Sequence, residues 1–282
     1  MGGLGVEAPK NEIPRHPVIL TRSYEIQQTE TTQALWMEVT DTDVNPSIFA
    51  ACGPDCPVTN LTFFDALLFA NAMSAKAGLP PCYELVECQE LFEGFGAECE
   101  AAQFAGPDCP GYRLPSEAEW EMAARAGSHT CFPDGQDQTG PWSCHPKEPL
   151  VETGWFCANS DVSFAGCVTC VDAHPSAFWN TCCGPHPVAG KAPNAYGLFD
   201  TSGNVGEITG TVFEETGPSD LEVDPGFSEP FRAGQTFSLR GGSFAWGNTG
   251  CCSTTRLAIG MNYQSIAAGV VGIRLARTLD LP

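Results

Sequence analysis

The sequence predicts an α+β fold with little regular secondary structure, in which disulfide bonds hold long loops together. Three observations support this prediction: a few strongly capped helical segments, short strand-like segments near both ends, and 15 cysteines among 282 residues. The length suits one large domain or two small ones, with a sizeable core in either case. The cysteine density is typical of proteins in an oxidising compartment.

The clearest helix is expected within residues 57–78. Thr62 is placed to cap it, Asp65 lies in its first turn, and Gly78 can end it in a left-handed conformation. A second helical pattern covers residues 31–39, after threonines that can serve as caps.

A third helix is expected after the sequence Y-R-L-P. Ser116 and Glu119 fit a capping box, and Gly127 follows the helical pattern. Residues 18–28 alternate like a strand, and the segments S-L-R-G-G-S-F and V-V-G-I-R-L-A-R read as short strands around glycine turns. Helices and strands therefore occupy only part of the chain.

Amino-acid composition distinguishes an N-terminal segment and two cysteine-rich segments in the rest of the chain. Residues 1–16 are rich in glycine, proline and charge, and we expect a flexible N-terminal segment before a domain over 17–282. Within that domain, residues 80–110 and 128–190 are predicted to be cysteine-rich insertions. Long segments without helix or strand periodicity need disulfides or metal ions to order them.

The charge of the chain restricts its partners. Lys and Arg total 13 against 34 Asp and Glu, for a formal net charge of −21. Such a surface repels nucleic acid and anionic lipid, so we expect no nucleic-acid partner. No run of 18 apolar residues occurs, and no membrane span is predicted. A peptide, protein or glycan ligand is compatible with this charge.

Six motifs occur in a fixed order along the chain: E-I-Q-Q-T-E-T-T-Q-A-L-W, P-V-T-N-L-T-F-F-D-A-L-L-F-A-N, Y-R-L-P-S-E-A-E-W-E-M-A-A-R, N-A-Y-G-L-F-D-T-S-G-N-V-G-E, R-G-G-S-F and G-I-R-L-A. Together they resemble the formylglycine-generating enzyme (sulfatase-modifying factor) family from about Ser23 to Arg277. The resemblance implies a single domain, a variant of the C-type lectin fold. In that family calcium ions stabilise the fold, and secreted members add disulfides.

The resemblance implies one calcium site in D-T-S-G-N-V-G-E. Asp200 and Glu207 would supply side-chain oxygens, and Gly203 and Val205 backbone carbonyls. Oxygen donors of these kinds suit calcium. The alternative interpretation is that these polar residues only build turns.

A second calcium site is implied by A-N-S-D and a later segment. The matching positions are Asn159, the carbonyl of Ser160, Asn180 and the carbonyl of Cys182. Asn180 stands where the family has aspartate, so this site has one negative charge fewer and a weaker predicted affinity.

In the resembled enzymes, two cysteines five residues apart follow R-G-G-S-[FW] and bind copper(I), which suits soft thiolates. The second of these positions is Cys251, but the first is Trp246, which cannot bind copper. Cys252 is adjacent to Cys251 and poorly placed for a linear site. Gly260 also stands where the family has a second arginine after Arg256.

Three interpretations of Cys251 and Cys252 follow, in decreasing order of preference. In the first, both form disulfides with other cysteines, with the adjacent pair Cys182 and Cys183 as suggested partners. In the second, one of them is a free thiol that binds a metal, which the odd cysteine count permits. In the third, they catalyse oxidation by an altered route. The C-V-T-C motif beginning at Cys167 is likewise expected to hold structural disulfides, in preference to a zinc half-site.

The preferred functional hypothesis is an extracytoplasmic ligand-binding protein, secreted, periplasmic or on the cell surface. The segment 245–270 is rich in Gly, Ser, Thr, Asn and Tyr, as recognition surfaces are. The alternatives are a copper-dependent oxidase that converts a protein cysteine to formylglycine, with Cys251 and Cys252 catalytic, and a structural part of a surface assembly. The candidate ligand contacts are Trp246, Asn248, Arg256, Asn262 and Tyr263.

Overall fold

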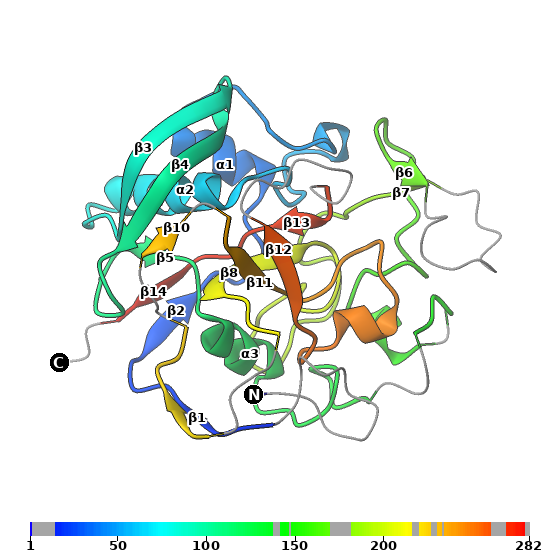
Figure 1. Ribbon diagram of the computed structural model, residues 1–282. Coiled ribbons are helices and arrows are strands. Elements are labelled where there is room, and N and C mark those ends of the chain that lie inside the picture. The colour runs from blue at the N-terminus through cyan, green and yellow to red at the C-terminus, as the bar shows by residue number, and fades with distance from the viewer. Residues whose placement is uncertain are drawn as a thin grey trace.

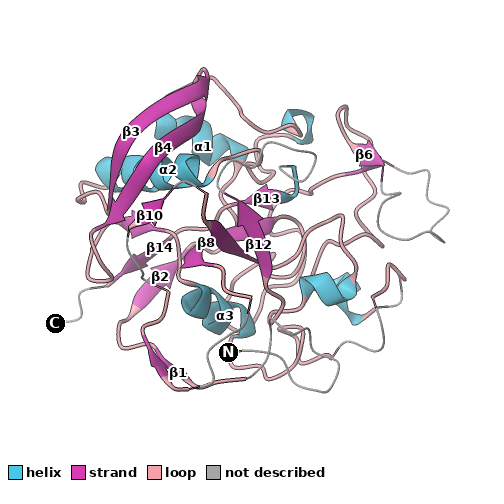
Figure 2. Ribbon diagram, in the orientation of Figure 1, coloured by secondary structure: helices cyan, strands magenta, loops and turns pink. Residues whose placement is uncertain are grey.

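Loops connect short helices and strands throughout the molecule (Figure 2). The computed structural model describes residues 1, 15–137, 142–146, 148–169, 182–215, 220–226, 230–232, 234–260 and 269–279. The helices are α1 (Gln33–Thr40), α2 (Phe63–Lys76) and α3 (Glu117–Arg125). The strands are β1 (Val18–Ile19), β2 (Tyr24–Ile26), β3 (Tyr83–Phe92), β4 (Phe95–Phe104), β5 (Tyr112–Arg113), β6 (Val168–Thr169), β7 (Cys182–Cys183), β8 (Gly206–Val212), β9 (Glu222–Val223), β10 (Phe231–Arg232), β11 (Thr236–Arg240), β12 (Leu257–Gly260), β13 (Val271–Gly272) and β14 (Ala276–Thr278). The mixed, loop-rich architecture predicted from the sequence is confirmed.

The helix α2 begins as its sequence predicts. The Thr62 side chain accepts a hydrogen bond from the Asp65 N–H, and the Asp65 carboxylate accepts one from the Thr62 N–H. This capping box satisfies two amide groups that the first helical turn leaves free. The helix ends at Lys76, and Gly78 follows with φ of +69°. The predicted helix at 31–39 is also confirmed, as α1, with Thr32 as its cap.

The helix α3 carries the second predicted capping box, formed by Ser116 and Glu119. Its chain leaves the helix at Ala126, which adopts a left-handed conformation one residue before Gly127. Most side chains of α3 are buried, including three glutamates, so this helix lies inside the molecule.

The strands form several small sheets. The largest has the order β12-β11-β8-β13, and a three-stranded sheet β2-β14-β5 joins residues near both ends of the chain (Figure 1). The single strand expected over 18–28 is instead two strands, because β1 pairs with β9 and β2 pairs with β14. The predicted strands around R-G-G-S and G-I-R-L are present as β11, β13 and β14.

The insertion at 80–110 is a long hairpin. The strands β3 and β4 pair along their whole length, from Tyr83 with Phe104 to Phe92 with Phe95. Two disulfides hold the segment, Cys82–Cys109 at its base and Cys88–Cys99 across the strands. β4 lies against α2 and also pairs with β10. The predicted stapling is confirmed, although the hairpin itself has no strong signal in the sequence.

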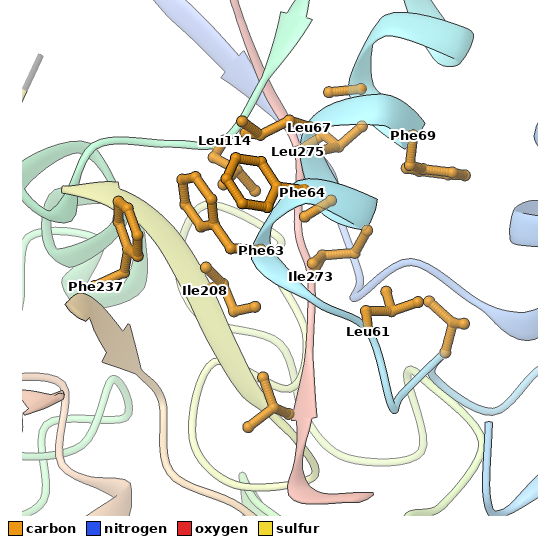
Figure 3. Close-up of a cluster of buried hydrophobic side chains, with 14 of the residues drawn as sticks. Leu61, Phe63, Phe64, Leu67, Phe69, Leu114, Ile208, Phe237, Ile273 and Leu275 are labelled. Carbon is orange, nitrogen blue, oxygen red and sulfur yellow. The ribbon is translucent and has the colours of Figure 1, made fainter. Parts of the chain in front are cut away.

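The main hydrophobic core lies between α2 and the sheet that contains β8 and β11 (Figure 3). Phe63 stacks on Phe237 of β11 with ring centroids 3.6 Å apart. Leu275, which precedes β14, lies in the same cluster. Burial of this aromatic and aliphatic surface is the largest stabilising contribution in a fold with so few long elements.

The predicted flexible segment 1–16 lies mostly outside the described residues. At its two ends, the Met1 amino group donates a hydrogen bond to the His16 carbonyl. None of the helices in the described ranges has the length and apolar character required to cross a bilayer.

Candidate functional site

The C-terminal cysteines lie beside a tight glycine turn that follows β11. Gly241 and Gly242 have φ of +87° and +76°, which side chains with a Cβ rarely adopt. A Cβ on Gly242 would lie 2.7 Å from the Cys251 sulfur and 2.6 Å from the Gly250 carbonyl oxygen. The turn therefore needs glycine because its backbone touches Cys251 directly.

Cys251 is a free thiol that is completely buried. Its sulfur lies 3.8 Å from the Ser243 carbonyl oxygen, in a small hydrophobic cluster that includes Phe132 and Phe156. Burial raises the pKa of the Cys251 thiol to about 12. At neutral pH this sulfur is protonated, and a thiolate here is strongly disfavoured.

Cys252 forms a disulfide with Cys131, which is 121 residues away in the sequence. The expectation that both adjacent cysteines form disulfides is therefore wrong for Cys251 and confirmed for Cys252. The suggested pairing with Cys182 and Cys183 is also wrong, because Cys182 pairs with Cys167 and Cys183 is bonded elsewhere.

The C-V-T-C motif begins with Cys167, whose disulfide confirms the structural interpretation for that residue. Its second cysteine, Cys170, lies outside the described residues. The disulfide removes Cys167 and Cys182 from any zinc site, since a metal ligand would have to be a thiolate.

Three buried carboxylates, from Glu30, Asp200 and Glu207, surround a single buried arginine, Arg274. Arg274 donates two hydrogen bonds to Glu207, at 2.8 and 2.7 Å. Trp120 of α3 donates a third. Glu207 is thus held in position from α3 and from the segment before β14.

The other two carboxylates have different partners. Glu30 accepts hydrogen bonds from the Val205 N–H at 3.0 Å and from the Asn204 side chain at 2.7 Å. One Asp200 oxygen accepts from the Ala189 N–H at 2.6 Å, while its Oδ1 is buried without a hydrogen-bond partner among the described residues. An unpartnered carboxylate oxygen in the interior is costly unless a cation or water meets it.

The charges of this cluster do not balance. Burial raises the pKa of Asp200 to about 6, and burial together with Asp200 and Glu207 raises the pKa of Glu30 well above its usual value. Lys191 also acts on Asp200, so three carboxylates against one guanidinium and one ammonium leave one excess negative charge when all are ionised. Glu30 has no counterpart among the candidate ligands found from the sequence, because only the folded chain brings it to residues 204–205.

A calcium ion fits these residues. Its charge would offset the excess, and the Asp200 oxygen without a partner is the type of ligand it prefers. Among the described residues, Glu207 Oε1 accepts only from Arg274 and keeps one lone pair for a cation, whereas Oε2 accepts from both Arg274 and Trp120. No three His, Cys, Asp or Glu side chains converge as a metal site within the described ranges. A calcium ion would therefore also need the Gly203 and Val205 carbonyls, as the sequence predicts.

Comparisons with known proteins identify the family. Residues 1–279 match the family described as the sulfatase-modifying factor enzyme 1-like domain. The chain belongs to this family. The resemblance found in the six sequence motifs is thereby confirmed.

Two curated relatives illustrate the range of the family. The chain is 32% identical over 187 residues to the "Chaperone protein LppX" of Paenibacillus barcinonensis, covering 64% of this chain and 60% of that protein. It is 31% identical over 178 residues to a "Formylglycine-generating enzyme" of Streptomyces coelicolor, covering 61% and 48%. The chain thus spans about half to three fifths of the length of these relatives.

Among solved structures, "Treponema denticola variable protein 1" is similar, with a TM-score of 0.66 and 26% identity. The similarity covers 93% of this chain and 86% of that one. The two chains therefore share a fold over nearly the whole length of this sulfatase-modifying-factor-like domain.

The residues present do not fit a two-thiolate copper site. Trp246 stands at the first cysteine position, half-buried, with its carbonyl accepting from the Cys157 N–H at 3.1 Å. The neighbouring Gly247 packs against the ring of Trp142, which leaves no room for a Cβ there. Cys251 has no second free thiol beside it among the described residues, because Cys252 is in a disulfide.

Two predicted ligand contacts have structural partners instead. Asn248 is completely buried: its amide oxygen accepts from the Ser143 N–H at 2.8 Å, and its amide nitrogen donates to Glu148. It joins the C-terminal turn to the loop that contains Ser143, so the structure corrects the expectation that it faces a ligand.

Arg256 is corrected in the same way. It is only 9% exposed and forms two hydrogen bonds with Glu117 of α3, at 2.6 and 2.8 Å. Asn262 and Tyr263 lie outside the described residues. Of the five candidate contacts, Trp246 alone is both described and partly exposed, and its role in binding stays a prediction.

The described members of the second predicted calcium site have other partners. The Asn159 side-chain oxygen accepts from the Phe156 N–H at 2.9 Å. The Ser160 carbonyl accepts from the Gly184 N–H, and the Cys182 carbonyl from the Val162 N–H at 2.8 Å. Asn180 lies outside the described residues, and this site also stays a prediction.

Proposed function

We propose that this chain is an extracytoplasmic, calcium-stabilised ligand-binding protein on a formylglycine-generating-enzyme-like scaffold, without the oxidase activity. The observation that carries the proposal is the environment of Cys251. Its thiol is buried and protonated, and the position of its copper-binding partner is Trp246. A linear copper(I) site needs two accessible thiolates, which this arrangement does not supply.

The ligand-binding surface is assigned to the turn between β11 and β12, which contains Trp246. Partly exposed tryptophan is a common anchor in recognition surfaces because it offers a large, rigid contact area. The turn rests on a stiff base, since Asn248, the glycines and the Cys131–Cys252 disulfide fix its backbone. The ligand is a peptide, protein or glycan that is neutral or cationic, because the chain has a net charge of −21.

The same proposal includes the C-type lectin variant of the fold and the extracytoplasmic location. Six disulfides among the described residues support an oxidising compartment. The relative named as a chaperone supports a binding role, since a chaperone acts by contacting another protein.

The decisive experiment is copper(I) titration of the purified protein with a competing chelator. We expect no stoichiometric site in the wild type, and none in the Cys251→Ser variant. The Trp246→Cys variant is the matched positive control, because it restores a cysteine at the first of the family's two copper-binding positions. Tight copper binding by the wild type that Cys251→Ser abolishes would overturn the proposal and favour the oxidase.

Calcium stabilisation is tested separately. Removal of calcium with a chelator should lower the melting temperature, since the Asp200 oxygen and the excess negative charge lose their counter-ion. An Asp200→Asn variant should respond less than the wild type to added calcium. An unchanged melting temperature after chelation, with metal analysis showing calcium removed, would contradict this part.

Two other functions are less well supported. The relatives named formylglycine-generating enzyme favour the copper-dependent oxidase, but the chain lacks the first cysteine that the resemblance calls for. A covalently linked surface assembly would need an exposed unpaired cysteine, whereas Cys251 is completely buried.

A further inference from the structure

Among the described residues, no strand pairs with the outer edge of the β3–β4 hairpin. The sheet order is β10-β4-β3, so β3 is the edge strand, and Figure 1 shows it on the outside of the molecule. Every residue from Glu87 to Phe92 is exposed. An exposed edge strand presents unpaired N–H and C=O groups that can accept another strand.

The hairpin is unusually acidic. It carries six glutamates, and no lysine, arginine or histidine occurs from Ala77 to Tyr112. The cation nearest in the sheet, Arg232, belongs to β10, which borders β4 on the side away from β3. The edge therefore has a strongly negative local charge.

Apolar side chains accompany this charge at the tip. Leu91 is 44% exposed and Phe92 is 48% exposed, and these are adjacent residues on opposite faces of the strand. Phe92 stacks on Phe95 with ring centroids 5.0 Å apart. An incoming strand would thus gain cross-strand apolar contacts as well as backbone hydrogen bonds.

The tip is held rigidly, so a partner would meet a preformed surface. The Asp65 carboxylate accepts hydrogen bonds from the Gly96 and Ala97 N–H groups, at 3.0 and 2.9 Å, which fixes β4 to the start of α2. The Cys88–Cys99 disulfide then fixes β3 to β4. Little conformational entropy is lost when a partner binds such an edge.

The local backbone restricts the docking segment. Glu87 has φ of +48°, which interrupts the extended conformation of β3 near its middle. The uninterrupted part of the edge is therefore Cys88–Phe92. A second copy of this chain is a poor occupant, because two hairpins would bring twelve carboxylates together, and like charges across strands are destabilising.

We propose that the outer edge of β3 from Cys88 to Phe92 is a docking surface for a cationic, extended protein segment that pairs as a further strand. Lysines or arginines of the partner would meet the glutamates that border this edge, and its apolar residues would contact Leu91 and Phe92. This surface is separate from the turn that carries Trp246, and it does not depend on that turn.

The test uses a fluorescent peptide of alternating lysine and valine, with fluorescence anisotropy in about 150 mM salt so that long-range attraction is screened. We expect the double variant Glu90→Lys with Glu93→Lys to weaken binding by about tenfold or more, because both residues are exposed and lie within or directly beside this segment. The matched control is Asp134→Lys with Glu215→Lys, which makes the same change in net charge at exposed residues elsewhere. It should change the affinity by less than about twofold. Leu91→Ser should weaken binding without a change of charge.

Three results would overturn the proposal. The first is equal binding of the same peptide with a fully N-methylated backbone, which cannot pair as a strand and would bind by charge alone. The second is equal weakening in the two charge variants. The third is concentration-dependent dimerisation of the wild type that Leu91→Ser abolishes, because the edge would then serve a second copy. Melting temperatures of all variants establish that each is folded.

Discussion

The Cys131–Cys252 disulfide permits a quantitative prediction about the turn that carries Cys251. It closes a loop of 121 residues. In the chain-entropy description, a loop of this length corresponds to about 5 kcal/mol of stabilisation. Two disulfides inside the loop, Cys144–Cys157 and Cys167–Cys182, shorten the free chain and reduce the value to about 4.7 kcal/mol.

The double variant Cys131→Ala with Cys252→Ala should therefore lose about 4.7 kcal/mol of unfolding free energy. The matched control is Cys52→Ala with Cys56→Ala, which opens a loop of only four residues and should lose about 2 kcal/mol. The assay is guanidinium denaturation without reductant, followed by tryptophan fluorescence. Equal losses in the two double variants would refute the reasoning, because the loop lengths would then be irrelevant.

Three further predictions concern buried groups. Burial, with Lys191 nearby, lowers the pKa of His186 to about 4; the unfolded state then binds more protons at this group, so the contribution of neutral His186 to stability should be lost between about pH 6.5 and 4, whereas the raised pKa values of Asp200 and Glu30 act in the opposite direction. His186→Phe, which keeps a ring stacked on Trp155, removes the His186 contribution alone, so its melting temperature should rise relative to the wild type as the pH falls through this range, and parallel curves would contradict the assignment. Asp65→Ala should lower the unfolding free energy by about 3 kcal/mol or more, because three buried N–H groups lose their acceptor. Asp43→Ala, on the surface, is the control in urea denaturation. Similar denaturation midpoints for the two variants would contradict the stabilising role of Asp65. Iodoacetamide at pH 8 should leave Cys251 unmodified in the native protein and modify it in guanidinium, as peptide mass spectrometry would show; native labelling would mean that the thiol is accessible.

Local signals in the sequence predicted the helices well. The pairs Thr62–Asp65 and Ser116–Glu119 are capping boxes that act within four residues, so their geometry is independent of the rest of the chain. The strands were predicted less well. The alternating segment 18–28 divides between two sheets because its partners, β9 and β14, lie about 200 residues or more away.

The candidate site depends on contacts that the sequence does not display. Cysteine partners cannot be derived from spacing alone, and the partner of Cys252 lies in the region with the least periodicity. Asn248 and Arg256 have the polarity of surface residues, yet the fold buries both with partners from other segments. Glu30 reaches the carboxylate cluster from a position about 170 residues before Asp200 in the chain.

The three glutamates of α3 have a consequence for engineering this chain. Glu117 contacts Arg240 and Arg256, Glu119 contacts Arg113, and Glu121 contacts Arg240 and Arg125. Ion pairs with one short helix thus hold distant parts of the chain in place. Removal of any one of these glutamates would deprive a buried or partly buried arginine of that carboxylate partner, so a single substitution on this helix would destabilise segments far from it in the chain.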